Sequence, residues 1–209
     1  TASAGTSNFR AGVNAGNSIE SGGNYNTVVG DEAGTAITTG DSNIGVGFGA
    51  VKAATTGSQN VGVGVNTLAT LTTASYNTAL GTSALTANTS GANNVAVGTN
   101  ALDANTTAAN NTAVGYDSLG ANTTGTDNVA VGAFAGDAIT TSSSNVAVGI
   151  RALSGETKGT NNVAIGRDAL AVQNTTSAVV SANTAVGALA GAAVTTGVQN
   201  TLIGGLAGD

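Results

Sequence analysis

Residues 110–132 read NNTAVGYDSLGANTTGTDNVAVG and contain nearly the same phrase twice, NTAVG and, 17 residues later, NVAVG. The phrase is an Asn, followed three residues later by an aliphatic residue and then by Gly. Self-similarity at a fixed period is typical of repeat architectures, in which each repeat is one small structural unit. The same phrase recurs in the rest of the chain.

The repeat occurs along almost the whole chain of 209 residues. Its twelve starts are Asn8, Asn26, Asn43, Asn60, Asn77, Asn94, Asn111, Asn128, Asn145, Asn162, Asn183 and Asn200. The spacing is 17 residues except for 18 after the first start and 21 after Asn162. Because no linker or change of composition interrupts the series, we expect a single domain over residues 1–209, with an excursion of four residues within 177–182.

Numbering each repeat from its Asn defines 17 columns. Columns two to four alternate a β-branched, a small and an aliphatic residue, as in Val95, Ala96 and Val97, which is the period of a strand. One face of this strand is apolar and the other is nearly bare. Gly in column five suits a turn at the end of the strand. Since no unit can bury its apolar face alone, we expect the stacking of units to bury it.

Columns nine and twelve vary together. A Gly in column nine accompanies Ile or Val in column twelve, whereas a Leu in column nine accompanies a polar residue. The Gly pairs are Gly16–Ile19, Gly34–Ile37, Gly136–Ile139 and Gly191–Val194; the Leu pairs are Leu85–Asn88, Leu102–Asn105, Leu119–Asn122, Leu153–Glu156 and Leu170–Gln173; Val51–Ala54 and Leu68–Leu71 depart from the rule. Because a close-packed interior tolerates exchange of volume, we predict that both columns fill one inner space. The segment between them is either a helical turn or a bend.

These units predict an all-β fold, a parallel β-solenoid (β-roll or β-helix) of about twelve 17-residue coils. Each coil adds one strand at ~4.8 Å, so the coils form a rod ~55 to 60 Å long. The Asn of column one is interpreted as a ladder of stacked side-chain amides. The repeat closes with Thr-Thr, as at Thr123 and Thr124, which are turn residues beside a strand former.

Composition narrows the function. The chain has no His and no Cys, so it lacks the usual proton shuttle, the thiolate nucleophile and the softer metal ligands. We therefore predict no catalysis, no cofactor and no metal. Five Lys and Arg against eleven Asp and Glu give no basic patch for nucleic acid, and no apolar run reaches the ~20 residues that cross a membrane. The lack of Met favours a processed or excised segment.

Phrases such as NNVAVGTNAL, NTAVGYDSLGANTTG and NNVAIGRDAL resemble the head repeats of trimeric autotransporter adhesins and the related repeats of bacteriophage tail-fibre proteins. The resemblance covers almost the whole chain, through the short core of Asn, a small residue, an aliphatic residue and Gly. It implies a parallel β-roll in an extracellular, cell-surface or virion fibre. It also implies a homotrimer and adhesion to a cell-surface receptor or glycan.

Several shorter motifs have simpler explanations. The stretch Gly45–Ala50, GVGFGA, fits a dinucleotide-binding fingerprint but lies inside the repeat, without a β-α-β unit. Asp31, Glu32, Asp103 and Asp137 could bind calcium, but these acids do not recur in adjacent coils, so we interpret them as solvated surface acids.

Two further motifs follow from the repeat itself. Ser118 has Asp117 beside it but no His to act as a base, so no hydrolytic triad can be assembled. Five Asn-x-Ser/Thr sequons matter only if the host glycosylates secreted chains. They lie at Asn88, Asn105, Asn110, Asn122 and Asn174.

The expected function is a non-catalytic structural subunit of an extracellular or virion fibre. The last copy ends ten residues after it begins, and seven residues precede Asn8, so end to end they make one more coil of 17 with Gly5 in column fifteen. We expect head-to-tail assembly into filaments. The joint would contain Thr1, Gly5, Leu202, Ile203, Leu206 and Asp209.

Three alternatives stay open. The chain could be a stretch cut from a longer repeat array, or an adhesin head that binds a surface partner. The Thr-Thr columns could also form a flat array that orders ice, although adjacent Thr residues in a strand point to opposite faces.

Overall fold

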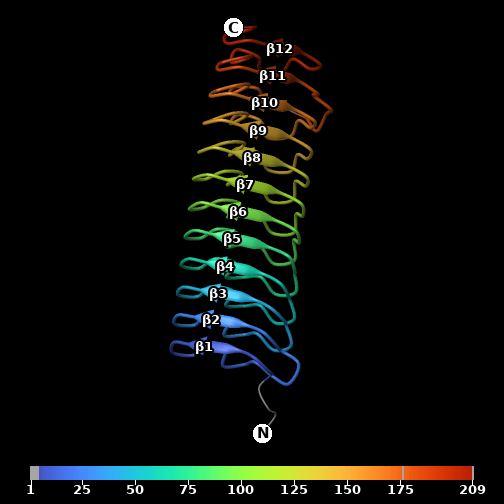
Figure 1. Cartoon of the computed structure of the whole chain (residues 1–209). Coiled ribbons are helices and arrows are strands. Elements are labelled where there is room, and N and C mark those ends of the chain that lie inside the picture. Colours follow the sequence, from blue (N-terminus) through green and yellow to red (C-terminus); the bar gives the residue numbers. More distant parts are fainter. Residues whose placement is uncertain (1–4, 176, 209) are drawn as a thin grey trace.

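The structure is a computed structural model that describes residues 5–175 and 177–208. It is a parallel β-solenoid with twelve strands in one sheet and, over those residues, no helix (Figure 1). The strands are β1 (Phe9–Ala11), β2 (Thr27–Val29), β3 (Ile44–Val46), β4 (Val61–Val63), β5 (Thr78–Leu80), β6 (Val95–Val97), β7 (Thr112–Val114), β8 (Val129–Val131), β9 (Val146–Val148), β10 (Val163–Ile165), β11 (Thr184–Val186) and β12 (Thr201–Ile203). The fold class expected from the repeats is confirmed.

Each strand pairs in parallel with the next one along the chain, and every residue lies beside the residue of its own column. This register holds across the two irregular spacings, where Phe9 pairs with Thr27 and Val163 with Thr184. The column numbering read from the sequence is therefore the hydrogen-bonding register of the sheet.

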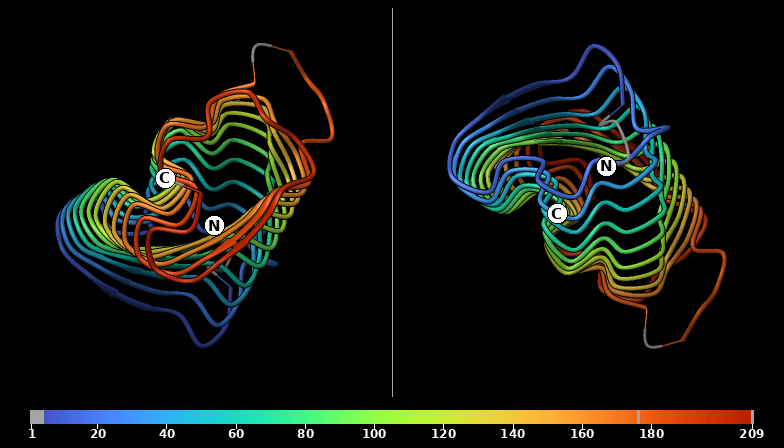
Figure 2. Two further views of the ribbon diagram at one scale, coloured as in Figure 1. Left: turned by 90° about the horizontal axis from the view of Figure 1, so that it is seen from above. Right: turned by 90° about the horizontal axis from the view of Figure 1, so that it is seen from below.

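The excursion stands out from the wall of the solenoid near its C-terminal end (Figure 2). Asn174 still holds column thirteen, because its backbone N–H donates to the carbonyl of Thr195 in the next coil. The wall resumes at Ser181, whose carbonyl accepts from the N–H of Gln199. The four extra residues thus lie between Asn174 and Ser181, an interval that overlaps the range expected from the sequence.

Columns five to twelve form a series of tight turns rather than a helix. In one coil, the N–H of Ala101 donates to the carbonyl of Gly98, and the N–H of Asn105 donates to that of Leu102. Asn100 and Leu102 have φ values of 57° and 53°. Left-handed residues at these alternate positions prevent a right-handed helix. The open choice between helical turn and bend is settled in favour of the bend.

The expectation that stacking buries the apolar face of each strand is wrong. The small residue of column three points inward, and Ala79, Ala96 and Ala113 are fully buried. Columns two and four, such as Val95 and Val97, point outward and stay partly exposed. Stacking along the axis pairs the backbone N–H and C=O groups of each strand with those of the neighbouring coils. It leaves the side chains on the outer face of the sheet uncovered.

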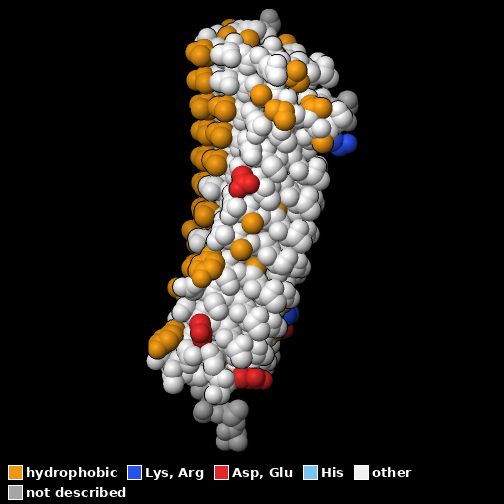
Figure 3. Space-filling view, turned by 90° about the vertical axis from the view of Figure 1, so that its right-hand side faces the viewer, with side chains coloured by type: hydrophobic (Ala, Val, Ile, Leu, Met, Phe, Trp, Pro, Cys, Tyr) orange, Lys and Arg blue, Asp and Glu red, His pale blue; other side chains and the backbone are white. Residues whose placement is uncertain are grey.

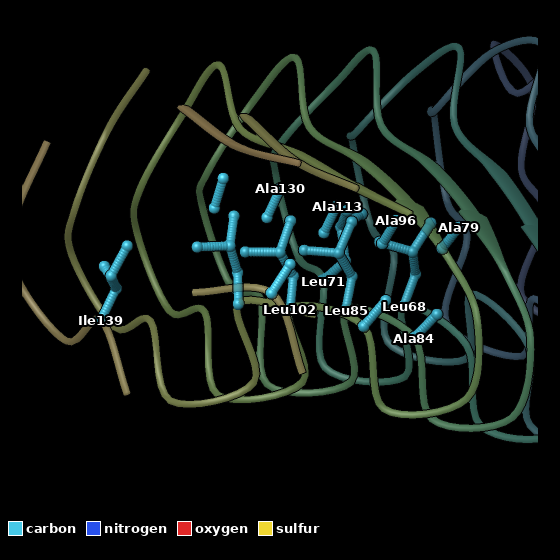
Figure 4. Close-up of a cluster of buried hydrophobic side chains, with 14 of the residues drawn as sticks. Leu68, Leu71, Ala79, Ala84, Leu85, Ala96, Leu102, Ala113, Ala130 and Ile139 are labelled. Carbon is cyan, nitrogen blue, oxygen red and sulfur yellow. The ribbon is translucent and has the colours of Figure 1, made fainter. Parts of the chain in front are cut away.

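The large interior groups come instead from columns nine and twelve, as the volume exchange predicts. Figure 4 shows Leu85 and Leu102 facing Ala79, Ala96 and Ala113 across the narrow interior. The exchange itself is visible at the next Gly-type coil. A Cβ placed on Gly136 would lie 3.1 Å from Cδ1 of Ile139 and 3.2 Å from Cδ2 of Leu119, so Ile139 fills the space that Leu fills elsewhere.

Column three also takes part in the exchange, which the sequence reading missed. A Cβ on Gly34 would lie 2.6 Å from Cγ1 of Val28, and a Cβ on Gly208 would lie 2.7 Å from Cδ2 of Leu202. A side chain larger than Ala is thus found in column three beside a Gly in column nine. Arg10 belongs to this set, next to Gly16, and its Nη1 donates to the carbonyl of Gly16 at 3.0 Å.

The column-one Asn residues form the expected ladder. The Oδ1 of Asn26 accepts from both the backbone N–H and the Nδ2 of Asn43, at 2.9 and 3.1 Å. The Nδ2 of Asn43 also donates to the carbonyl of Gly57 at 2.8 Å. Asn43 and Asn60 repeat the pattern, and these side chains are fully buried. Each buried amide is thereby satisfied, and each coil is fixed in register with the next.

Candidate interaction surfaces

The described part of the chain has neither a pocket nor a group of His, Cys, Asp and Glu side chains arranged to hold a metal ion. Ser118 is fully buried and its Oγ donates to the carbonyl of Ala130 at 3.1 Å. The stretch Gly45–Ala50 forms part of β3 and the turn after it, without the helix that a dinucleotide site needs.

The most extensive surface is the outer face of the sheet, which we call the apolar face. Figure 3 shows hydrophobic side chains gathered in a band along one side of the rod. The face consists of columns two and four of all twelve strands and contains no charged residue. Its exposed large hydrophobic residues are Phe9, Ile44, Leu80, Val129, Val131, Ile165 and Ile203.

A second surface joins three acids that the sequence reading treated as unrelated. Asp103 and Asp137 lie in column ten, two coils apart, and the coil between them has Gly120 there. Asp117, from column seven, fills the gap, since a Cβ on Gly120 would lie 2.3 Å from its Oδ1. The three acids therefore form one group, in which Asp103 and Asp137 are partly buried rather than fully solvated.

The electrostatics of this group follow from its geometry. Burial raises the pKa of Asp103 and of Asp137, and the charge of Asp117 raises both further. Oδ1 of Asp137 is buried without a hydrogen-bond partner among the described residues. The sequence carried a signal for the group, because Gly120 is the position in column ten at which a neighbouring side chain can enter.

A third surface lies on the turn edge, in columns six and seven of four successive coils. Arg151 holds Asp168 through two bonds, Nε to Oδ1 at 2.7 Å and Nη2 to Oδ2 at 3.2 Å, and Nη1 of Arg167 lies 2.6 Å from Oδ2. The bond from Arg151, with smaller contributions from the charges of both arginines, lowers the pKa of Asp168. The rings of Tyr116 and Phe134 meet edge to face, with centroids 5.2 Å apart. We call these five residues the basic–aromatic edge.

The two Thr columns differ sharply. The hydroxyls of column thirteen donate to the column-thirteen carbonyl of the next coil at 3.0 to 3.2 Å, from Thr38 through Thr140. Column fourteen is exposed. Its exposed Thr and Ser residues include Thr39, Thr56, Thr73, Ser90, Thr107, Thr124 and Thr141. Of its two hydroxyls in these columns, each coil from Thr38 to Thr141 therefore leaves one that does not bond to the next coil, so a flat array for ice lacks its second row.

The five sequons fall into two groups. Asn88, Asn105 and Asn122 are fully buried in column twelve, and their amides form a second internal ladder at 3.2 and 3.3 Å. Asn110 and Asn174 are exposed. In the folded chain only these two side chains offer an amide to a modifying enzyme.

The residues expected at the end-to-end joint are placed as follows. Gly5 holds column fifteen, since its N–H donates to the carbonyl of Glu20 as that of Gly40 does to Thr55. Leu202 points inward and packs against the core. Ile203 and Leu206 lie in outward columns and are 71% and 57% exposed. Thr1 and Asp209 lie outside the described residues.

Comparison with protein-family models, with curated proteins and with solved structures finds no match for this chain. No helix in the described residues is long and apolar enough to span a lipid bilayer.

Proposed function

We propose that the chain is a non-catalytic structural subunit of an extracellular or virion fibre, in which rods associate side by side through the apolar face. The observation that carries the proposal is the length of this face, which runs over β1–β12 without a charge. A strip ~55 Å long and ~10 Å wide amounts to roughly 550 Å², near the upper end of the largest apolar patch on a typical monomer, and such patches are often functional.

A second copy of the chain is the partner that fits this face. The side chains of columns two and four repeat once per coil, at the ~4.8 Å spacing of the sheet. A partner matches these ridges over the whole length only if its own surface repeats at the same spacing, and another copy does so. Two copies would form a pair, and three would form the trimer that the resemblance to adhesin heads implies.

Axial growth extends the same proposal. Residues 5–7 hold columns fifteen to seventeen of a coil, and the inward-pointing Leu202 lies in the last described coil. A further coil, from this chain or from a second molecule, would continue the backbone pairing of the sheet and the column-one Asn ladder in register, and it would cover the end of the core. Head-to-tail contact between rods is thus the axial part of the proposed fibre.

Charge on the apolar face tests the lateral association. Val97→Lys together with Val114→Lys places ammonium groups in the middle of the face, whereas Thr107→Lys with Thr124→Lys places them on the exposed column fourteen. Sedimentation velocity should show oligomers for the wild type and the Thr variant, and monomers with an unchanged circular dichroism spectrum for the Val variant. A wild type that stays monomeric at every concentration would refute lateral association, and electron micrographs without filaments would refute the axial part.

A further inference from the structure

The basic–aromatic edge stands apart from the rest of the surface. The described chain has five Lys and Arg in all, and two of them, Arg151 and Arg167, meet on one carboxylate. Tyr116 and Phe134 precede them on the same edge and are 50% and 37% exposed. In repeat proteins the variable positions of successive units, gathered on one face, often form the binding surface.

The backbone fixes these side chains at regular intervals. The N–H of Phe134 donates to the carbonyl of Tyr116 at 2.9 Å, and the N–H of Asp168 donates to that of Ile150 at 3.0 Å. The edge therefore advances by one coil, ~4.8 Å, at each step, and Tyr116 and Arg167 are separated by three steps, ~14 Å. The five residues lie in turns whose backbone is hydrogen-bonded to the neighbouring coils, so the Cα positions of these residues are fixed relative to one another.

Asp168 orients both guanidinium groups without using all their donors. It occupies Nε and Nη2 of Arg151 and Nη1 of Arg167. Nη1 of Arg151, and Nε and Nη2 of Arg167, have no partner among the described residues. The side chains of the two arginines are 57% and 55% exposed. Two arginines paired with one aspartate leave one net positive charge. Because Asp168 holds both guanidinium groups in place, their remaining N–H groups are oriented to donate to a carboxylate.

We propose that the basic–aromatic edge binds a carboxylated sugar of an acidic glycan. The carboxylate would accept from Arg167 and Arg151, and the sugar ring would lie against Phe134 and Tyr116. This inference goes beyond the structural role of the rod and holds whether or not rods associate.

The shape and charge of the edge favour a sugar over other ligands. The surface has no pocket in the described part, so it cannot enclose a peptide side chain, but it can support one face of a sugar ring. Asp117 adjoins Tyr116 and Asp137 lies close by in the next coil, so a long polyanion such as nucleic acid would be repelled at that end. A ligand with one carboxylate at the arginine end and neutral hydroxyls elsewhere avoids this repulsion.

Binding of a trisaccharide that contains one glucuronic acid and two neutral sugars, measured by titration calorimetry against its methyl ester, tests the proposal. The ester keeps the rings and removes the charge. We expect saturable binding of the acid and binding of the ester weaker by about tenfold, the effect of losing a charge-assisted bidentate contact. Arg167→Gln should weaken binding of the acid by about tenfold as well. Asp168 keeps both bonds to Arg151 in this variant, so the melting temperature should stay unchanged.

Lys52→Gln is the matched control, since Lys52 is also exposed and paired with one carboxylate, that of Glu32. It should bind the acid like the wild type. Phe134→Leu, which keeps an apolar group but removes the ring, should weaken both the acid and the ester. The proposal is overturned if the wild type does not bind the acid saturably, if acid and ester bind equally, or if Lys52→Gln weakens binding as much as Arg167→Gln. Oligomeric state, measured on the same samples, reports separately on the proposed fibre.

Discussion

Two neighbouring coils fill the same inner space with a large side chain from different columns. The coil that begins at Asn111 has Leu119 in column nine and Asn122 in column twelve, and the next coil has Gly136 and Ile139 in those columns. Both large groups are buried, with Ile139 1% exposed and Leu119 fully enclosed. The backbone barely differs, since φ is 51° at Leu119 and 59° at Gly136.

The difference shows that this backbone requires a left-handed residue in column nine, whichever side chain is present. Gly adopts that conformation without strain, whereas Leu is strained by about 1–2 kcal/mol. The Leu coil gains something in exchange, because column twelve is then free for an amide. Asn122 donates to Oδ1 of Asn105 at 3.3 Å and to the carbonyl of Gly125 at 3.0 Å, and so joins an internal ladder that Ile139 interrupts.

The largest effect is expected where a coil has only one large inner group. Ile139→Ala removes that group from a coil whose other inner residues include Ala130 and Gly136. The cavity should cost about 2–5 kcal/mol of unfolding free energy, as for large-to-small changes in other cores. Urea unfolding followed by circular dichroism measures the loss, with the exposed Thr141→Ala as control. A loss no larger than that of the control would show that Ile139 does not hold the coil together.

Leu119→Gly should cost less than Ile139→Ala. It removes a buried Leu, but it also relieves the left-handed strain at column nine, so the net loss should be roughly 1–3 kcal/mol. Adding Asn122→Ile converts the coil to the composition of its neighbour and should recover part of the loss. A double-mutant cycle should give a favourable coupling of about 1 kcal/mol or more, and additive effects would contradict the shared inner space.

The internal ladder provides a smaller test. Asn105 donates to Oδ1 of Asn88 at 3.2 Å and to the carbonyl of Ala108 at 3.1 Å, and its Oδ1 accepts from Asn122. Asn105→Ala leaves these buried partners unsatisfied and should cost about 1–3 kcal/mol. The exposed Thr107→Ala in the same coil should change the unfolding midpoint little. Equal midpoints for the two variants would mean that the ladder fills space without stabilising the fold.

The period of the sequence was enough to predict the strands, their register and the column-one Asn ladder. Volume exchange between columns nine and twelve predicted the shared inner space before any side-chain position was known. These predictions succeed because a solenoid aligns equal columns, so each column of the sequence reports on one local environment.

The face of each strand that points into the solenoid could not be predicted in the same way. Alternation in columns two to four shows that the two faces differ, and it does not show which one is inside. The width of the interior decides, and that width is set by the groups of columns nine and twelve. In the coil of Val51, a Cβ added to Gly45 would lie 2.4 Å from Cγ2 of Val51, so only small residues fit in column three there.

The candidate surfaces were less predictable than the fold because they depend on side chains from different columns. Arg151 and Asp168 share column seven, but Arg167 joins them from column six and the Tyr116–Phe134 pair also spans both columns. Reading one column at a time does not reveal such groups. A search for large or charged residues in adjacent columns of adjacent coils would have found this edge.

The smallest expected effect concerns column ten, where the two neighbouring coils differ again. The Leu coil has Gly120, over which Asp117 lies, and the Gly coil has Asp137. Burial and the charge of Asp117 raise the pKa of Asp137 above its ordinary value of 3.8. A carboxyl with a raised pKa in the folded state holds its proton more tightly there than in the unfolded chain. Its ionisation therefore lowers stability as pH rises through the folded-state pKa.

Asp137→Asn removes this charge and keeps the size of the side chain. It should raise the unfolding free energy at pH 7, by less than about 1 kcal/mol because the group is partly solvated, and the gain should vanish below pH ~3.8, where the carboxyl is protonated in both states. Asp127→Asn, at an exposed column-seventeen position outside the acidic group, is the control. Melting temperatures of both variants between pH 3 and pH 7 measure the difference. A gain that is the same for both variants, or that persists at the acid end, would show that the close approach of Asp117 and Asp137 does not destabilise the coil.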